Sequence, residues 1–400
     1  MTDNSRRHIL VAIVVFVALV GSALPAVAQS APPWSWGPIL GMITETSAAV
    51  TWKTIRPVGF DFSYALAQVY DSSRTWDETL TYERYEGVAE IWLNDLLPDT
   101  VYRYQLIFYE GDAVYPTEVG TFRTADPDAR SLSFAVYGAT ASSPDRHRLV
   151  AETILEQTDA AIVFHAGGLV EVPTEERFAN FFWAMGSLGQ SASFLPVIGN
   201  HDGDDDLYYD AFALPTGGGS HDEQWWSFDV GPIHFVGLDS TVSDEADPSA
   251  MQEQTAWLKQ DLAGAVDQFI LVFCAEALYS ASYPSGTNEP LVSTWAPVFR
   301  QYGVDVVFSS SVHCYEHVYS RGVHYVTTGG GGATLVDPPG DAVSGTAFRR
   351  YGLLHYVRVT LADDALQVEA VPVATVADDV VTLSATGRSI DTFVLLLNER

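Results

Sequence analysis

The chain has 400 residues, which is more than one average domain and favours two. Hydrophobic residues make up 47% of the chain and charged residues 18%, a composition that excludes a largely disordered protein. The formal net charge is −31, from 51 acidic and 20 basic residues, and such a surface repels phosphate backbones, so nucleic acid is excluded as an expected partner.

The N-terminus is predicted to be a secretory signal peptide covering residues 1–28. A basic start at Arg6-Arg7 precedes an apolar run over 9–20 and a small-x-small cleavage site at 26–28. The alternatives are an uncleaved membrane anchor and a twin-arginine export signal. The rest of the sequence has no stretch apolar enough to span a membrane. We therefore expect a secreted or periplasmic mature chain without a membrane span.

Residues 33–125 are predicted to form an all-β sandwich. Short runs alternate apolar and polar side chains between turn residues, and no helical period competes with this pattern. The segment 96–104, LLPDTVYRY, resembles the signature of fibronectin type III domains, in which a tyrosine pins a corner between the sheets. Residues 125–128 are predicted to be a short linker.

From residue 131 to residue 400 strand-like and helix-like segments alternate, which predicts β-α-β units and a largely parallel sheet. Strands are predicted over 132–137, 160–165, 194–198, 269–273 and 304–308, and helices over 146–157, 175–188, 251–266 and 291–302. A hairpin is predicted over 225–239, and further hairpins at 356–360 and 366–371. This mixture favours two packed sheets with helices outside them.

The residues that follow the predicted strands are the candidates for chemistry, because ligands gather at the carboxyl ends of strands in open α/β sheets. The first two strands lead to Ala139 and Gly168, and the third to Asn200-His201-Asp202. The last two lead to Ala275-Glu276 and to a segment that contains Ser310, Ser311 and His313.

The order and spacing of these segments over 131–335 resemble the calcineurin-like metallophosphoesterases of the purple acid phosphatase type. LPVIGNHD at 195–202 fits the family pattern fully, and VDVVFS at 304–309 fits up to the point where the ligands should begin. The resemblance implies a fibronectin III-like front domain, followed by a four-layer (αββα) phosphoesterase domain. It also implies two metal ions, bridged by an aspartate, that polarise a phosphate and generate a hydroxide nucleophile.

The sequence departs from the family pattern at the metal ligands themselves. Ala139 and Gly168 stand where the family has aspartates, and Ala275 and Ser311 stand where it has histidines. Asn200 and His313 keep the residual ligand positions, and His201 keeps the catalytic position that steadies the phosphate. Two neutral ligands cannot offset two cations, and a zinc site alone needs three or four protein ligands.

Two interpretations of the site follow. In the first, no metal cofactor is expected. In the second, a single weakly bound Zn, Mn or Fe ion is held by substitute ligands, for which the candidates near the lost positions are His165, Glu171, Asp202 and Glu276. A Ser–His pair between the serines at 309–311 and His313 has no identifiable orienting acid.

The predicted function is that of an exported pseudophosphatase with a binding or structural role. Its former active-site pocket is expected to take an anionic or phosphorylated ligand, and the sequence names no other partner. One alternative is an acid-phosphatase-like hydrolase of phosphomonoesters that uses the rebuilt site. The other is a cell-surface interaction protein in which the β-sandwich matters more than the pocket.

Cys274 and Cys314 are predicted to form a disulfide across the former metal site. Both lie just beyond strands that are expected to be neighbours, and an exported chain meets an oxidising compartment. The alternative is a pair of buried free thiols that pack as small apolar side chains.

Overall fold

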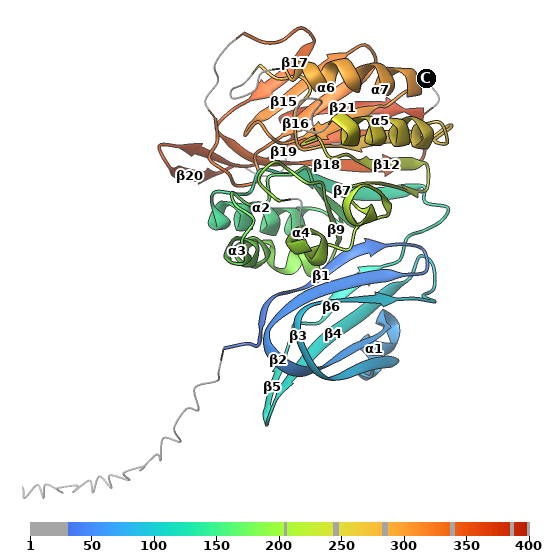
Figure 1. Cartoon of the computed structure of the whole chain (residues 1–400), viewed down its shortest axis with the longest axis vertical. Coiled ribbons are helices and arrows are strands. Elements are labelled where there is room, and N and C mark those ends of the chain that lie inside the picture. Colours follow the sequence, from blue (N-terminus) through green and yellow to red (C-terminus); the bar gives the residue numbers. More distant parts are fainter. Residues whose placement is uncertain are drawn as a thin grey trace, which may run out of the picture. The chain divides into compact units, whose positions relative to one another are not determined.

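The structure is a computed structural model, and it describes residues 31–203, 206–242, 248–281, 287–336, 341–384 and 388–397. The predicted signal peptide at 1–28 lies outside the described residues. By their contacts the residues from Pro33 onward form one unit. The described part of the chain is mostly β-structure, arranged in three sheets with a small number of helices (Figure 1).

The first sheet has six strands, in the order β1-β2-β4-β5, with β3 paired to β2 and β6 paired to β4. These strands are β1 (Trp34–Ile43), β2 (Ala48–Leu66), β3 (Glu78–Leu93), β4 (Val101–Glu110), β5 (Ala113–Pro116) and β6 (Gly120–Arg123). The β-rich prediction for this region is confirmed, except that a helix, α1 (Ala67–Ser73), follows β2. Two helical turns are too short to show a helical period in the sequence.

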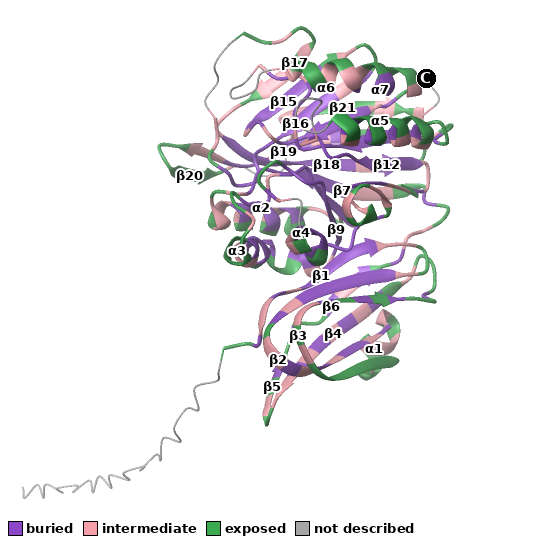
Figure 2. Ribbon diagram, viewed as in Figure 1, coloured by how far each residue is buried: buried purple, intermediate pink, exposed green. Residues whose placement is uncertain are grey.

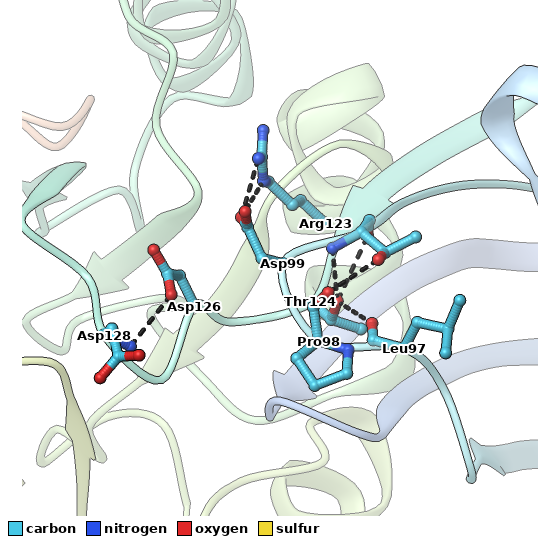
Figure 3. Close-up of polar contacts among 8 residues, drawn as sticks. Leu97, Pro98, Asp99, Arg123, Thr124, Asp126 and Asp128 are labelled. Atoms are coloured by element: carbon cyan, nitrogen blue, oxygen red, sulfur yellow. Dashed lines mark hydrogen bonds and ion pairs between the residues drawn. The ribbon is translucent and has the colours of Figure 1, made fainter.

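Tyr102, at the start of β4, contacts the backbone just upstream of that strand. The backbone N–H of Leu97 donates a 2.9 Å hydrogen bond to the hydroxyl oxygen of Tyr102, whose ring stacks on Phe122. The hydroxyl of Thr124 lies 2.6 Å from the carbonyl oxygen of Leu97, as Figure 3 shows beside the Arg123–Asp99 ion pair. This upstream backbone is therefore tied to the segment that leads into β7.

Direct contacts join the first sheet to the rest of the unit. The hydroxyl of Thr51 donates to the carbonyl oxygen of Ala211 over 2.9 Å, and the ring of Trp36 stacks on Phe182 at 4.3 Å. Gly41 packs so closely on Ala213 that a Cβ atom would lie 2.7 Å from the Cβ atom of that residue. Glycine is needed here because two backbones approach each other closely.

The second sheet has the order β20-β19-β18-β7-β8-β9, with β21 paired to β19. Its strands are β7 (Ser131–Tyr137), β8 (Ile162–His165), β9 (Ser193–Pro196), β18 (Leu353–Ala362), β19 (Ala365–Ala377), β20 (Val380–Leu383) and β21 (Asp391–Leu396). The strands β7, β8 and β9 are parallel, whereas β18 and β19 form the predicted C-terminal hairpin.

The third sheet has eight strands, in the order β10-β11-β12-β13-β14-β16-β15-β17. They are β10 (Gly217–Gly218), β11 (Trp225–Val230), β12 (Ile233–Gly237), β13 (Phe269–Phe273), β14 (Val306–Ser309), β15 (Tyr315–Ser320), β16 (Val323–Thr328) and β17 (Thr346–Arg350). The strands β12, β13, β14 and β16 are parallel, and β11 and β12 form the predicted hairpin.

Aromatic side chains join the second and third sheets into one core. The ring of Phe164 on β8 stacks on Phe273 on β13 at 4.1 Å, and Phe134 meets Phe235 edge to face at 5.3 Å. Side chains at alternate positions of the third sheet belong to a separate buried cluster, which includes Val272 of β13 and residues of α5 and α7. Figure 2 shows that these central strands are almost wholly buried.

The helices mostly agree with their prediction. They are α2 (Pro144–Gln157), α3 (Glu175–Met185), α4 (Asp206–Ala211), α5 (Pro248–Leu262), α6 (Glu289–Thr294) and α7 (Ala296–Tyr302), with short 3-10 turns at Gly186–Gln190 and Ser220–Asp222. The helix predicted over 291–302 is divided at Trp295, because Pro297 lacks the N–H that a continuous helix needs. Within the described ranges, none of the helices has the length and apolar character needed to cross a bilayer.

A buried histidine connects α5 to strands β11 and β12 of the third sheet. The Nδ1 atom of His234 on β12 lies 2.7 Å from Oδ1 of Asp229, and its Nε2 atom lies 2.8 Å from Oδ2 of Asp261 on α5. Both ring nitrogens can donate to a carboxylate only when the imidazole is protonated. Burial lowers the pKa of His234, but the hydrogen bonds and charges of the two aspartates outweigh burial and raise this pKa to about 9.

We expect this triad to make stability depend on pH. The folded-state pKa of His234 lies above its unfolded value of about 6.5, so the stabilisation is present below pH ~6.5 and is lost as the pH rises through about 9. Between these limits the free energy of unfolding should fall by on the order of 2 kcal/mol more in the natural chain than in a His234→Gln variant. Urea unfolding at a series of pH values measures this difference.

The matched control is His221→Gln, since His221 is an exposed histidine with a single aspartate partner at 3.3 Å. Its pH profile should follow that of the natural chain. Identical pH profiles for His234→Gln and the natural chain would show that the triad contributes no pH-dependent stability.

Candidate functional site

The loops that follow five parallel strands line one cavity of about 570 Å³. The strands are β7, β8 and β9 of the second sheet and β13 and β14 of the third. The lining residues are Ala139, Ala141, Ser142, Gly168, Val170, Glu171, Asn200, His201, Ala275, Glu276, Ser310, Ser311, His313 and Val336. All seven residues that the sequence places at ligand or catalytic positions are therefore brought together, although four of them are Ala, Gly, Ala and Ser.

The backbone of the first two loops is held in left-handed conformations. Ala139 has φ +56°, and Gly167 and Gly168 have φ +84° and +71°. Alanine adopts this region at a cost of about 1–2 kcal/mol, whereas glycine, aspartate and asparagine adopt it more readily. The N–H of Ala139 donates to the carbonyl oxygen of Gly167 over 3.0 Å, so the two loops fix each other.

A serine fills the space behind these loops. The hydroxyl oxygen of Ser310 lies 2.5 Å from the carbonyl oxygen of Ala166 and 2.8 Å from that of Gly167. A Cβ atom on Gly138 would lie only 2.6 Å from the side chain of Ser310. The loop after β14 is therefore bound to the loops after β7 and β8 by neutral contacts.

Asp202 organises the cavity from behind and is not part of its lining. Its Oδ1 atom accepts hydrogen bonds from the N–H groups of Leu169 and Val170, and its Oδ2 atom accepts from those of Gly168 and Gly199, at 2.7–3.1 Å. Burial raises the pKa of the Asp202 carboxyl to about 7, against the four backbone hydrogen bonds that lower it. The sequence proposed Asp202 as a substitute ligand, but all four of these contacts are to backbone.

Glu276, in the loop after β13, brings a carboxyl group to the cavity lining. Burial raises its pKa, and a hydrogen bond from the Ser311 hydroxyl and the charge of His201 act in the other direction. The Oγ atom of Ser311 also accepts a 3.0 Å hydrogen bond from the N–H of Ala277. Ser311, Glu276 and His201 thus line one cavity, and Ser311 and His201 both act on the Glu276 carboxyl, which the sequence could not show because the three residues come from three loops.

His313 is oriented by a backbone carbonyl. Its Nδ1 atom lies 2.8 Å from the carbonyl oxygen of Thr334, so Nδ1 carries a proton and donates to this carbonyl, and Nε2 is the nitrogen outside that hydrogen bond. Glu171 lines the same cavity and pairs with Arg177 at 3.6 Å, with both side chains nearly half exposed. His313 and Glu276 are the two side chains best placed to offer a donor atom.

His165, another proposed substitute ligand, lies outside the cavity lining. It is fully buried, and its Nε2 atom lies 3.2 Å from the hydroxyl oxygen of Thr140. Among the described residues its Nδ1 atom has no hydrogen-bond partner. Burial holds the pKa of His165 well below its usual range, so the ring is neutral.

The predicted disulfide is not formed, and this expectation was wrong. Cys274 and Cys314 are both buried, and neither is part of a disulfide. Cys274 packs with the cluster beneath α5 and α7, while Cys314 packs with Ala277 and Val312 in a separate small cluster. The alternative of two apolar thiols holds, because the neighbouring strands turn the two side chains into different clusters.

The donor set does not fit a two-metal centre. Ala139, Gly168 and Ala275 bring no donor atom to the cavity, and the hydroxyl of Ser311 is already engaged with Glu276 and Ala277. Over the ranges that the structure describes, no three His, Cys, Asp or Glu side chains are grouped so that they could hold one ion.

Sequence comparison finds partial relatives, and no known family profile matches the chain. An uncharacterised protein of Mycobacterium tuberculosis is 27% identical over 285 residues, which cover 60% of this chain and 53% of that protein. Purple acid phosphatase 23 of Arabidopsis thaliana is 32% identical over 139 residues, which cover 31% of this chain and 29% of that protein. The chain thus aligns with about half of these relatives' length or less.

Solved structures share the fold over most of the chain. Purple acid phosphatase PPD1 from yellow lupin seeds matches with a TM-score of 0.68 at 16% identity, over 90% of this chain and 74% of its own. PhoD matches with a TM-score of 0.68 at 12% identity, over 92% of this chain and 91% of its own. GAP50, described as the anchor in the inner membrane complex of Plasmodium, matches with a TM-score of 0.54 at 18% identity, over 68% and 90%. The chain therefore has the fold of purple acid phosphatase PPD1 and PhoD, and part of its sequence is similar to plant purple acid phosphatases.

Proposed function

We propose that the chain is an exported pseudophosphatase, in which the cavity at the strand ends serves binding or structure and not two-metal hydrolysis. One observation carries the proposal: Ala139, Gly168 and Ala275 line the same cavity as Asn200 and His313 but offer no ligand atoms. Two adjacent cations need several anionic donors at once. The loss of donors at several positions therefore removes the nucleophile-generating chemistry of the family.

Export rests on the N-terminal sequence, since residues 1–28 carry a basic start, an apolar run and a cleavage site. We propose two domains within this unit, 33–125 and 131–400, and the change from the first sheet to the second between β6 and β7 supports these boundaries. We assign the first to a fibronectin III-like domain, supported by the hydrogen bond between Leu97 and Tyr102. We assign the second to an αββα arrangement, supported by the aromatic core between its sheets and by the separate cluster beneath α5 and α7.

A structural role has support from the fold comparison. GAP50, which shares this fold, is described as an anchor protein. A shared fold does not determine function, so the analogy gives only the class of role and names no partner. An interaction role for the first sheet is compatible with the same proposal. Thr51 and Trp36 of this sheet contact the rest of the unit, so a partner bound to the sheet would be joined to the whole unit.

The alternative is a phosphomonoester hydrolase with one weakly bound divalent metal. Two observations favour it. The Nδ1 atom of His313 is bound to the carbonyl group of Thr334, which leaves Nε2 outside that hydrogen bond. Glu276 and His201 are close enough for their charges to interact. Asn200, His313 and Glu276 would hold the ion, and His201 would steady the phosphate. Such an ion would polarise a phosphate oxygen.

Metal content and activity distinguish the two proposals. After incubation with Zn, Mn or Fe ions and dialysis, we expect the purified chain to keep far less than one metal ion per molecule. Hydrolysis of p-nitrophenyl phosphate should be no faster for the natural chain than for His201→Ala, because no metal-activated nucleophile exists. Elemental analysis and a colorimetric assay measure these two quantities.

Variants of the residual ligands complete this experiment. Asn200→Ala and His313→Ala should behave as the natural chain does in both measurements. A metal-dependent rate that His313→Ala or Asn200→Ala abolishes would instead establish the rebuilt site.

Restoring the ligands should restore metal binding. The variant combines Ala139→Asp, Gly168→Asp, Ala275→His and Ser311→His with Ser310→Gly. We expect it to bind divalent metal, as isothermal titration would measure, and to gain phosphatase activity. Position 139 already has the left-handed backbone that aspartate tolerates, but a Cβ atom at 168 would lie 3.3 Å from the Cα atom of Ala139, so the thermal midpoint should fall slightly.

The matched control carries asparagine in place of aspartate at 139 and 168, which keeps the shape and removes the charge. Single restorations should bind little metal, because each ion needs several ligands at once. Strong metal binding by a single restoration would mean that a working site already existed.

A further inference from the structure

A second cavity, of about 330 Å³, lies on the side of the third sheet that faces α7. Its walls come from α6, α7, β16, the β15–β16 turn and the loop after β13, and it shares no lining residue with the cavity at the strand ends. Tyr279 and Tyr325 form one wall, with their rings packed edge to face at 4.7 Å. Ser320 and Ser344 add hydroxyl groups to the rim.

Two arginines face this cavity without a carboxylate among its lining residues. Arg300 lies in the last turn of α7, and Arg321 lies in the β15–β16 turn. Burial raises the pKa of the Tyr325 hydroxyl, and the charge of the nearby Arg300 acts in the opposite direction. The guanidinium group of Arg300 therefore lies close to the tyrosine wall of the cavity.

The two arginines also stand apart from the ion pairs of the chain. Acidic residues number 51 against 20 basic ones, so carboxylates outnumber the basic side chains that they can pair with. Ion pairs to Asp or Glu are made by Lys53, Arg56, Arg103, Arg123, Arg130, Arg146, Arg148, Arg177 and Arg358. Within the described ranges neither Arg300 nor Arg321 makes one. The cavity thus concentrates two positive charges in a chain whose field repels anions.

We propose that this cavity binds a phosphate or sulfate group, either free or carried by a small ester. Guanidinium groups present planar donors that match tetrahedral oxyanions, and charge-assisted hydrogen bonds to them are stronger than neutral ones. The tyrosine wall gives the organic part of an ester an apolar surface to pack against. The site is independent of the former metal site and does not rest on its proposed function.

Isothermal titration with inorganic phosphate, sulfate and phenyl phosphate at low ionic strength tests the assignment. We expect one saturable site, and the comparison of inorganic phosphate with phenyl phosphate separates a free anion from an ester. Arg300→Gln and Arg321→Gln should each weaken binding about tenfold, because each removes one charged donor pair. Both side chains are exposed, so the thermal midpoint should not change.

Two controls locate the site. Arg74→Gln removes the same charge from an arginine that stacks over Tyr70 elsewhere on the chain, and should leave the affinity unchanged. His201→Ala alters the cavity at the strand ends, and should also leave it unchanged. No saturable binding, an unchanged affinity in the Arg300→Gln/Arg321→Gln double variant, or loss of binding in His201→Ala would each overturn the proposal.

Discussion

A single buried carboxylate holds the walls of the strand-end cavity in position. Asp202 accepts four backbone hydrogen bonds, three from the Gly168–Val170 loop and one from Gly199. Because a buried N–H without an acceptor costs about 1–3 kcal/mol, these donors and the carboxylate stabilise one another. This carboxyl group joins the loops after β8 and β9, which carry Gly168, Asn200 and His201 of the cavity lining.

Neutral contacts take the place of charge on the other side of the cavity. In a two-metal centre the cations cross-link loops from separate strands. Here the Ser310 hydroxyl contacts the carbonyl groups of Ala166 and Gly167, and Ser311 links Glu276 to the N–H of Ala277. Ser310 and Ser311 therefore supply hydrogen bonds between the loops. A cavity held in this way can keep its form without cations, as a binding module requires.

The distribution of charge separates the two cavities chemically. The strand-end cavity has Glu171 and Glu276 in its lining and no lysine or arginine, so an anion would meet carboxylates there. The cavity beside α7 has Arg300 and Arg321 and no carboxylate in its lining. In a chain with a net charge of −31, local arginines decide where an anion is held, because the overall field opposes binding everywhere else.

The sequence by itself determined most of the strand and helix order and the parallel centre of the sheets, because hydrophobic periodicity is a local property of the chain. It did not determine that the helix over 291–302 is divided at Trp295 or that Cys274 and Cys314 form no disulfide. Nor did it show that Asp202 accepts hydrogen bonds from backbone N–H groups. Only the tertiary structure shows that Ser311 contacts Glu276 and that Arg300 and Arg321 line one cavity. Each of these depends on which loops meet and which way a side chain turns, and packing between segments distant in sequence sets both.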